Sequence, residues 1–292
     1  MAWQGKRVVE LAPSGQVDAL APTVSLANGV AMPAIGLGTW PMDDAEAAGA
    51  VARAIGRGYR LIDTAQNYGN EAGVGAGVRA SGVAREEIFL TTKFNRAWHS
   101  VAGVREACEA SLKRLGMDYI DLYLIHWPNP DQDRYLDAFH GLQRVAEAGL
   151  VRAIGVSNFK PAHLARLLDA GLVPQVNQIQ LDPYHPRADI VAIHQAHGIV
   201  TESWSPIGRG NALLADPAIL RIAADHGRSP AQIVLRWQVQ QGFIPTPKSA
   251  DAGRQAANLA LFDFALSAEE MAVLGGLGRA DPDMMDADVF GH

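Results

Sequence analysis

The chain has 292 residues, of which 48% are hydrophobic and 19% charged, and a formal net charge of −6. An acidic balance without any run of basic residues argues against a surface that binds nucleic acid, because such a surface needs clustered Lys and Arg. Cys108 is the only cysteine, so no intrachain disulfide can form. No apolar run approaches the roughly 18 residues of a membrane span, and Glu10 interrupts the first apolar stretch before it could serve as a secretory signal. We therefore expect a cytoplasmic protein with no nucleic-acid or membrane partner.

The first predicted element is a short β-hairpin. Val24–Leu26 and Val30–Met32 flank Asn28-Gly29, a dipeptide that favours the tight turn between two antiparallel strands. We expect this hairpin to plug one end of the main fold. Residues 1–22 contain prolines and glycines with weak periodicity, and we interpret them as an N-terminal extension.

From residue 35 onward, short apolar runs alternate with helical patterns. Most runs are continuous, as expected of parallel strands that are buried on both faces. Eight such strands separated by helices predict a single (β/α)8 TIM-barrel domain over residues 23–292, because a doubly wound sheet usually stops near six strands. The candidate strands are Ile35–Leu37, Leu61–Ile62, Ile88–Thr91, Ile120–Leu124, Ala153–Val156, Gln175–Gln178, Val200–Ser203 and Phe243–Ile244. The clearest helical patterns are Asp44–Ile55, Val101–Leu115, Leu136–Ala148 and Pro161–Leu168.

Two capping signatures predict further helices toward the C-terminus. Ser229 precedes a proline and stands three residues before Gln232, and Ser267 stands three residues before Glu270. After Gly278 the sequence is acidic and irregular. It is typical either of a loop that covers a site or of a disordered segment, and the sequence alone favours neither.

The glycine-rich motifs do not predict a familiar nucleotide-binding loop. Gly36 and Gly38 run into Pro41 without a third glycine, and Gly73–Gly77 has the wrong spacing for a dinucleotide fingerprint. We interpret both groups as turn or close-packing glycines. The P-loop, the His-Glu-x-x-His zinc motif and a complete nucleophile elbow are absent from the sequence, and no metal is expected.

Polar or aromatic residues follow nearly every predicted strand. In a barrel the carboxyl ends of the strands meet at one face, where active sites are built. Taken singly, Asp63 could be a helix N-cap, His126 a buried structural histidine and Tyr68 a surface tyrosine. Lys93 at the end of a buried strand is less easily explained, because it must pair with an acid or lose its charge. The residues at these strand ends are Asp63, Lys93, His126, Ser157, Asn158, Gln178, Trp204 and Lys248.

Taken together, Asp63, Tyr68, Lys93 and His126 suit the reduction of a carbonyl group. That reaction needs a hydride donor and an acid that protonates the developing alkoxide. A tyrosine has an ordinary pKa of about 10, and a nearby ammonium makes it a better acid by stabilising the phenolate. An aspartate keeps the ammonium charged and in place, and a histidine can orient the carbonyl oxygen.

The sequence resembles the aldo-keto reductase family over nearly the whole chain from about Val24. The segment from Gly58 to Gly75 is similar to the family's first signature. Shorter motifs then follow in the family's order, at Thr92-Lys93, Asp121–Pro128, Gly155–Phe159 and Pro247–Ser249. The likeness is strongest to the prokaryotic branch that includes the 2,5-diketo-gluconate reductases. It implies NADPH as the cofactor and a small carbonyl compound as the substrate.

The resemblance also implies a role for each matching residue. Asp63, Tyr68, Lys93 and His126 match the catalytic tetrad. The nicotinamide end of the cofactor would contact Ser157, Asn158, Gln178 and Trp204, where the indole stacks on the ring. The pyrophosphate would lie along Ser205, Pro206, Ile207 and Gly208. The 2′-phosphate and adenine would contact Lys248, Ser249, Arg254 and Asn258. The substrate pocket would be walled by the aromatic residues Trp40, Phe94 and Trp127.

Several positions depart from the family's pattern. Ala257 stands where relatives often carry a glutamate that contacts the cofactor, and Asp251 introduces an acid near the expected 2′-phosphate site. Gln180 and Asp182 replace a common Glu and His. These changes bear on cofactor affinity and substrate range, whereas the catalytic set is intact.

Two alternatives remain open beside an NADPH-dependent reductase of aldehydes and small ketones. One is a nicotinamide-binding module that senses redox state with little turnover. The other is a barrel lyase or isomerase that uses the same acid–base residues without a nicotinamide. We expect the protein to act as a monomer.

Overall fold

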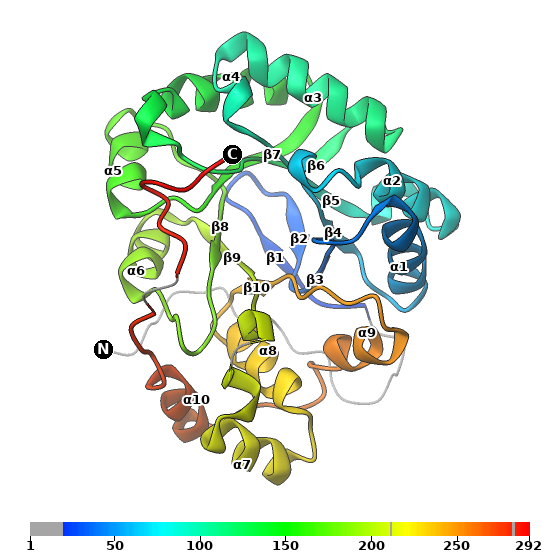
Figure 1. Cartoon of the computed structure of the whole chain (residues 1–292), viewed down its shortest axis with the longest axis vertical. Helices are drawn as coiled ribbons and strands as arrows, with labels where there is room; N and C mark the ends of the chain where they lie inside the picture. Colours follow the sequence, from blue (N-terminus) through cyan, green and yellow to red (C-terminus); the bar gives the residue numbers. More distant parts are fainter. Residues whose placement is uncertain (1–19, 211, 282–283) are drawn as a thin grey trace.

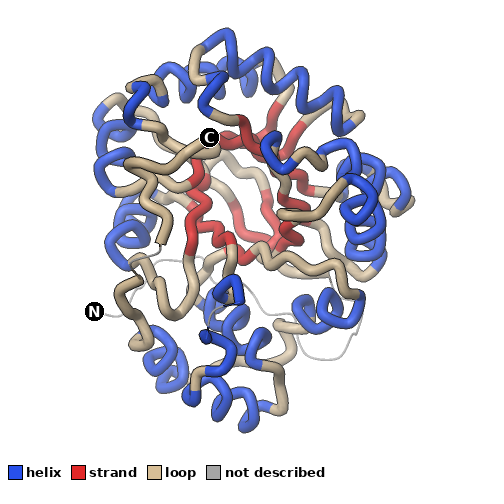
Figure 2. The backbone as a smooth tube through the Cα atoms, viewed as in Figure 1, coloured by secondary structure: helices blue, strands red, loops and turns tan. Residues whose placement is uncertain are grey.

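The computed structural model describes residues 20–210, 212–281 and 284–292. Within these ranges, eight parallel strands form a ring in chain order, surrounded by helices (Figures 1 and 2). A parallel bridge between Gly38 and Lys248 completes the ring. The strands are β3 (Gly36–Gly38), β4 (Leu61–Asp63), β5 (Phe89–Phe94), β6 (Ile120–Ile125), β7 (Val151–Ser157), β8 (Val176–Gln180), β9 (Val200–Trp204) and β10 (Ile244–Pro245). The fold is the predicted (β/α)8 barrel.

The helices cover the outside of the strands, and the last ones lie beside the end of the ring (Figure 1). α9 and α10 follow the final strand. The capping signature at Ser267 predicted a helix here, and Ser267 is the N-cap of α10. The helices are α1 (Asp44–Gly56), α2 (Glu71–Ala80), α3 (Val101–Leu115), α4 (Tyr135–Glu147), α5 (Pro161–Asp169), α6 (Ala188–His197), α7 (Pro217–His226), α8 (Pro230–Gln240), α9 (Ala252–Leu259) and α10 (Ala268–Gly275).

The hairpin prediction is confirmed. β1 (Thr23–Ser25) and β2 (Ala31–Pro33) pair antiparallel, and they lie across the ring of strands in Figure 1. Leu26 and Met32 are buried in one cluster with the barrel's inward-facing residues. The hairpin therefore closes one end of the barrel and leaves the other end for a site. Residues 1–19, most of the predicted N-terminal extension, lie outside the described residues.

Close-packing glycines bring neighbouring elements together. A Cβ on Gly38 would lie 2.7 Å from the carbonyl oxygen of Thr246, and a Cβ on Gly73 would lie 2.1 Å from that of Asp44. Both distances are too short for a real side chain, so these glycines let β3 approach the end of β10 and let α2 approach α1. The packing interpretation of both glycine groups is therefore correct.

Strand alternation divides the core in two. Successive side chains of a strand point to opposite faces, so Phe89 of β5 joins the cluster inside the barrel, whereas Leu90 and Phe94 join the cluster between the strands and the helices. Cys108 of α3 belongs to that outer cluster and is fully buried, which agrees with its interpretation as a small core residue.

Candidate active site

A cleft of about 810 Å³ opens at the end of the barrel that the hairpin leaves free. Its walls come from loops that are far apart in the sequence. Trp40 and Pro41 follow β3, Trp127 follows β6, and Phe290 and His292 belong to the C-terminal segment. The predicted site residues that line it are Trp40, Asp63, Tyr68, His126, Trp127, Ser157, Asn158, Gln178, Trp204, Ser205, Pro206, Ile207 and Lys248.

Lys93 and Asp63 form a buried ion pair next to the cleft. The lysine Nζ lies 2.8 and 2.9 Å from the two carboxylate oxygens of Asp63 and 2.9 Å from the carbonyl oxygen of Thr64. Burial is the largest single influence and lowers the pKa of Lys93, but the charge and hydrogen bond of Asp63, together with Tyr68 and Glu202, outweigh it, and the pKa is raised. Lys93 is therefore an ammonium, as the sequence predicted for a lysine at this position.

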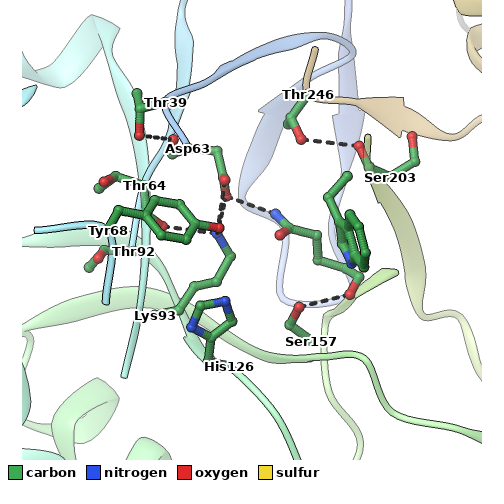
Figure 3. Close-up of polar contacts among 12 residues, drawn as sticks. Thr39, Asp63, Thr64, Tyr68, Thr92, Lys93, His126, Ser157, Ser203 and Thr246 are labelled. Atoms are coloured by element: carbon green, nitrogen blue, oxygen red, sulfur yellow. Dashed lines mark hydrogen bonds and ion pairs between the residues drawn. The ribbon is translucent and has the colours of Figure 1, made fainter. Parts of the chain in front are cut away.

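The same ammonium reaches the phenol of Tyr68. The Lys93 Nζ lies 3.4 Å from the Tyr68 oxygen, and Figure 3 shows the two side chains converging with Asp63. Burial raises the pKa of Tyr68, while Lys93 lowers it by a smaller amount, so the pKa stays above its ordinary value. Lys93 therefore acts in the expected direction and makes Tyr68 a better acid than burial alone would leave it. Lys93 offsets part of the cost of burial, and Tyr68 holds its proton at neutral pH.

His126 lies beside Tyr68, with ring centroids 5.7 Å apart. It is almost fully buried, and burial, together with the positive charge of Lys93, holds the pKa of His126 well below its ordinary range. The imidazole is therefore neutral. A neutral ring carries one N–H, so His126 can donate a hydrogen bond to an oxygen in the cleft without adding a charge there.

The predicted nicotinamide contacts form one connected network. The Asn158 amide donates to the His126 carbonyl oxygen at 3.0 Å, and its oxygen accepts from the Trp204 indole at 2.8 Å. The Ser157 hydroxyl donates to the Gln178 carbonyl oxygen at 2.9 Å, and the Gln178 amide donates to Asp63 at 2.7 Å. These bonds fix the amide, hydroxyl and indole groups that line the cleft.

Phe94 is not part of the cleft, and its predicted place in the substrate pocket is wrong. Its side chain is fully buried and packs against His99 and Tyr123, with ring centroids 5.9 and 5.1 Å away. The reason is strand alternation. Because Lys93 points into the barrel, the next residue must point outward.

The predicted 2′-phosphate residues lie at the edge of the cleft rather than inside it. Lys248 lines the cleft and is exposed, with its Nζ 3.4 Å from Glu46. Arg254 is exposed on α9, whereas Ser249 and Asn258 are buried. The Asp251 carboxylate caps α9 by accepting from the Arg254 backbone N–H at 2.8 Å. Gly208 lines an adjoining cavity of about 380 Å³.

The C-terminal segment, which the sequence left open between a loop over a site and a disordered segment, contributes to the cleft. Phe290 packs edge-on against Trp127 at 4.8 Å, and the His292 ring lies 5.1 Å from that of His126. Lys160, which lies between β7 and α5, bonds both Asp286 and Asp288. The irregular segment after Gly278 is thus, where it is described, a loop over the site. Its residues carry no motif that could have signalled this.

The donor set fits a nicotinamide dinucleotide. An aromatic face (Trp204), fixed amide groups (Asn158, Gln178) and an exposed cation (Lys248) lie along one cleft. Asn158 and Ser205 have positive φ values of 65° and 51°, and such backbone strain in non-glycine residues is concentrated at ligand sites. No cluster of His, Cys, Asp and Glu among the described residues could hold a metal ion.

Comparison with known proteins gives the same assignment. The aldo/keto reductase family model matches residues 34–278. The chain is 47% identical to 2,5-diketo-D-gluconic acid reductase B of Corynebacterium sp. (strain SHS752001), over 90% of this chain and 97% of the relative. It is 45% identical to morphine 6-dehydrogenase of Pseudomonas putida, over 91% and 96%.

Solved structures agree with the fold. An aldo/keto reductase from Brucella melitensis superposes with a TM-score of 0.85 at 43% identity, covering 88% of this chain and 99% of that one. A point mutant of Gox0644 in complex with NADPH has a TM-score of 0.88 at 41% identity, covering 92% and 98%. The chain belongs to the aldo/keto reductase family and is an oxidoreductase. No helix in the part that the structure describes has the length and apolar character to span a membrane.

Proposed function

We propose that this enzyme reduces aldehydes and small ketones to alcohols, with Tyr68 as the proton donor. NADPH is the cofactor and supplies the hydride. The observation that carries the proposal is the contact between the Lys93 ammonium and the Tyr68 phenol at the base of the cleft. It places a protonated acid next to a fixed positive charge, which the protonation of a developing alkoxide requires.

The chain's own residues divide the work of reduction. His126, held neutral, donates a hydrogen bond that orients the carbonyl oxygen toward Tyr68. Tyr68 then gives its phenolic proton to that oxygen as the carbonyl carbon becomes an alcohol carbon. Lys93, kept charged by Asp63, stabilises the phenolate that remains until it regains a proton from solvent.

The cofactor residues proposed on the same basis fall into three groups. Ser157, Asn158 and Gln178 would bind the carboxamide, and Trp204 would stack on the nicotinamide. Ser205, Pro206, Ile207 and Gly208 would follow the pyrophosphate. The 2′-phosphate and adenine would be bound by Lys248, Ser249, Arg254 and Asn258.

The substrate class follows from the walls of the cleft. Trp40, Trp127 and Phe290 are large aromatic residues that line it, and they favour small or flat carbonyl compounds. We propose three candidates, namely compounds like 2,5-diketo-gluconate, compounds like methylglyoxal, and aromatic aldehydes. The identity of 47% to a 2,5-diketo-D-gluconic acid reductase supports the first.

A panel assay tests this proposal. NADPH oxidation is followed with the three carbonyl classes, and the purified alcohol product is identified for each substrate that reacts. We expect at least one class to reach a kcat/KM typical of enzymes, at or above about 10⁴ M⁻¹s⁻¹. Tight NADPH binding without turnover of any class would favour the redox-sensing module instead.

We also propose that the enzyme is a cytoplasmic monomer. Size-exclusion chromatography with light scattering would test the oligomeric state.

A further inference from the structure

A second carboxyl group lies inside the barrel near the Asp63–Lys93 pair. Glu202 belongs to β9, and its side chain is fully buried. It pairs in register with Gln178 of β8 and Ile244 of β10. Paired residues of neighbouring strands face the same side of a sheet, so Glu202 points into the barrel as Gln178 does. The mechanism described above makes no use of it.

The Glu202 carboxyl has little to hold it ionised. Among the described residues, neither of its oxygens has a hydrogen-bond partner. The Gln178 amide is near enough to favour the ionised form, but it already donates to Asp63. Lys93, the cation that acts on Glu202, donates to both oxygens of Asp63. The Lys93 ammonium thus acts on two carboxyl groups but donates hydrogen bonds only to that of Asp63.

The charge balance decides which carboxyl keeps its proton. Burial raises the pKa of Glu202 most, and the Asp63 carboxylate raises it further. Lys93 and then Gln178 lower it, and the pKa lies at about 8. The other carboxyl groups of the described residues whose pKa is shifted, Asp251, Glu270 and Asp286, are shifted downward. Glu202 is therefore neutral near pH 7 and ionises in mildly alkaline solution.

Ionised Glu202 would act on the proton donor. Its negative charge raises the pKa of Lys93 and that of Tyr68. The charged or titratable groups that face it are Asp63 from β4, Lys93 from β5 and Tyr68 from the turn after β4. The adjacent strands contribute the uncharged Gln178 and Ile244.

We propose that Glu202 is a positioning residue that supports reduction only while it is protonated. While Glu202 is neutral, the positive charge of Lys93 stabilises the Tyr68 phenolate that forms as the proton passes to the carbonyl oxygen. Ionised Glu202 opposes that phenolate, so reduction slows although Tyr68 still holds its proton. The inference rests on the proposed role of Tyr68.

The first test compares the pH dependence of kcat for aldehyde reduction in the wild type and in Glu202→Gln, which keeps the size of the side chain and cannot ionise. We expect wild-type kcat to fall severalfold near pH 8 and by no more than about tenfold, because Glu202 is the smallest of the influences on the pKa of Tyr68 and a full pKa unit corresponds to a factor of ten. The variant should lack this step, whereas Glu269→Gln, at an exposed position of α10, should keep it. A wild-type profile without the step, or one unchanged in Glu202→Gln, would overturn the proposal.

A second measurement needs neither a variant nor turnover. In protein labelled with 13C at the glutamate side-chain carboxyl, one NMR resonance of the wild type should titrate near pH 8, far from the ordinary value of about 4.3. Absence of such a resonance contradicts the proposal even where Glu202→Gln does not fold. If the resonance is present but no carbonyl compound is reduced, the proposed function is wrong, whereas the titration of a buried glutamate near pH 8 is still supported.

Discussion

We expect two opposing sets of charges at the edge of the cleft to set the preference between NADPH and NADH. Lys248 and Arg254 are exposed cations that can bond a 2′-phosphate, and hydrogen bonds to charged groups are worth about 1.5–3 kcal/mol each. Glu46 and Asp251 are acids that lie beside them. Because Asp251 caps α9 and Glu46 contacts the Lys248 ammonium, both negative charges are held where the phosphate would bind.

We predict a modest preference for NADPH over NADH that two variants move in opposite directions. Arg254→Ala should raise the KM for NADPH roughly 10-fold or more and leave that for NADH nearly unchanged. Glu46→Gln should lower the KM for NADPH by no more than about fivefold, because exposed ion pairs are weak. The measurement is kcat/KM for both cofactors. Equal use of the two by the wild type, unaffected by either variant, would show that these residues do not contact the phosphate.

The Lys93 ammonium supports Tyr68 and balances Asp63. We predict that Lys93→Met lowers kcat at least about 10²-fold and moves the alkaline limb of the pH profile upward, because Lys93 lowers the pKa of Tyr68. The variant also leaves Asp63 buried without its cation, which costs about 3–5 kcal/mol of stability.

Asp63→Asn/Lys93→Met provides the matched control for stability. It should unfold at a higher temperature than the single Lys93→Met variant and remain as inactive. A pH profile unchanged in Lys93→Met would limit Lys93 to a structural role.

The structure brings together the four residues that the sequence proposed for catalysis, whereas the walls of the cleft were harder to predict. Asp63, Lys93 and His126 could be predicted because a polar side chain at the end of a buried strand needs an explanation. Phe290 and His292 could not, because they lie in an irregular segment whose path depends on contacts with Trp127 and Lys160. Glu202 could have been noticed in the sequence, because a glutamate in the middle of a buried strand must be paired or neutral.

Among the elements, the strands were the most predictable because their apolar runs are short and continuous. The predicted ends fell a little early at β5 and β9, which continue to Phe94 and Trp204. The cause is the site itself. At β5, Lys93 is polar, yet it lies within the strand because its side chain pairs with Asp63 inside the barrel, so a reading based on apolar residues stops before it.

Helix packing yields a prediction at Gly73 of α2. In Gly73→Ala the new Cβ would meet the backbone of Asp44, so α1 and α2 must move apart. Overpacking of this kind costs about 1–3 kcal/mol, and the melting temperature should fall by several degrees. Gly56→Ala is the control, because that glycine also lies in a helix and has no atom within 4 Å of the added Cβ. Similar melting temperatures for the two variants would contradict the packing argument.

In the molecule as a whole, the barrel gathers residues distant in sequence into one chemical unit. The hairpin closes one end, and the loops and the C-terminal segment surround the other (Figures 1 and 2). Asp63, Tyr68, Lys93 and His126 come from successive parts of the first half of the chain, and the predicted cofactor contacts come from the second half. We therefore expect that a single substitution can separate catalysis from cofactor binding.

Tyr68→Phe is that substitution. The phenol oxygen contacts Lys93, and the ring alone should contribute little to cofactor binding. Two quantities are measured on wild type and variant, namely kcat for a simple aldehyde and the Kd for NADPH from fluorescence titration. We predict a loss of at least about 10²- to 10⁴-fold in kcat with the Kd unchanged within about twofold. Near-normal turnover in Tyr68→Phe would contradict the assignment of Tyr68 as the proton donor.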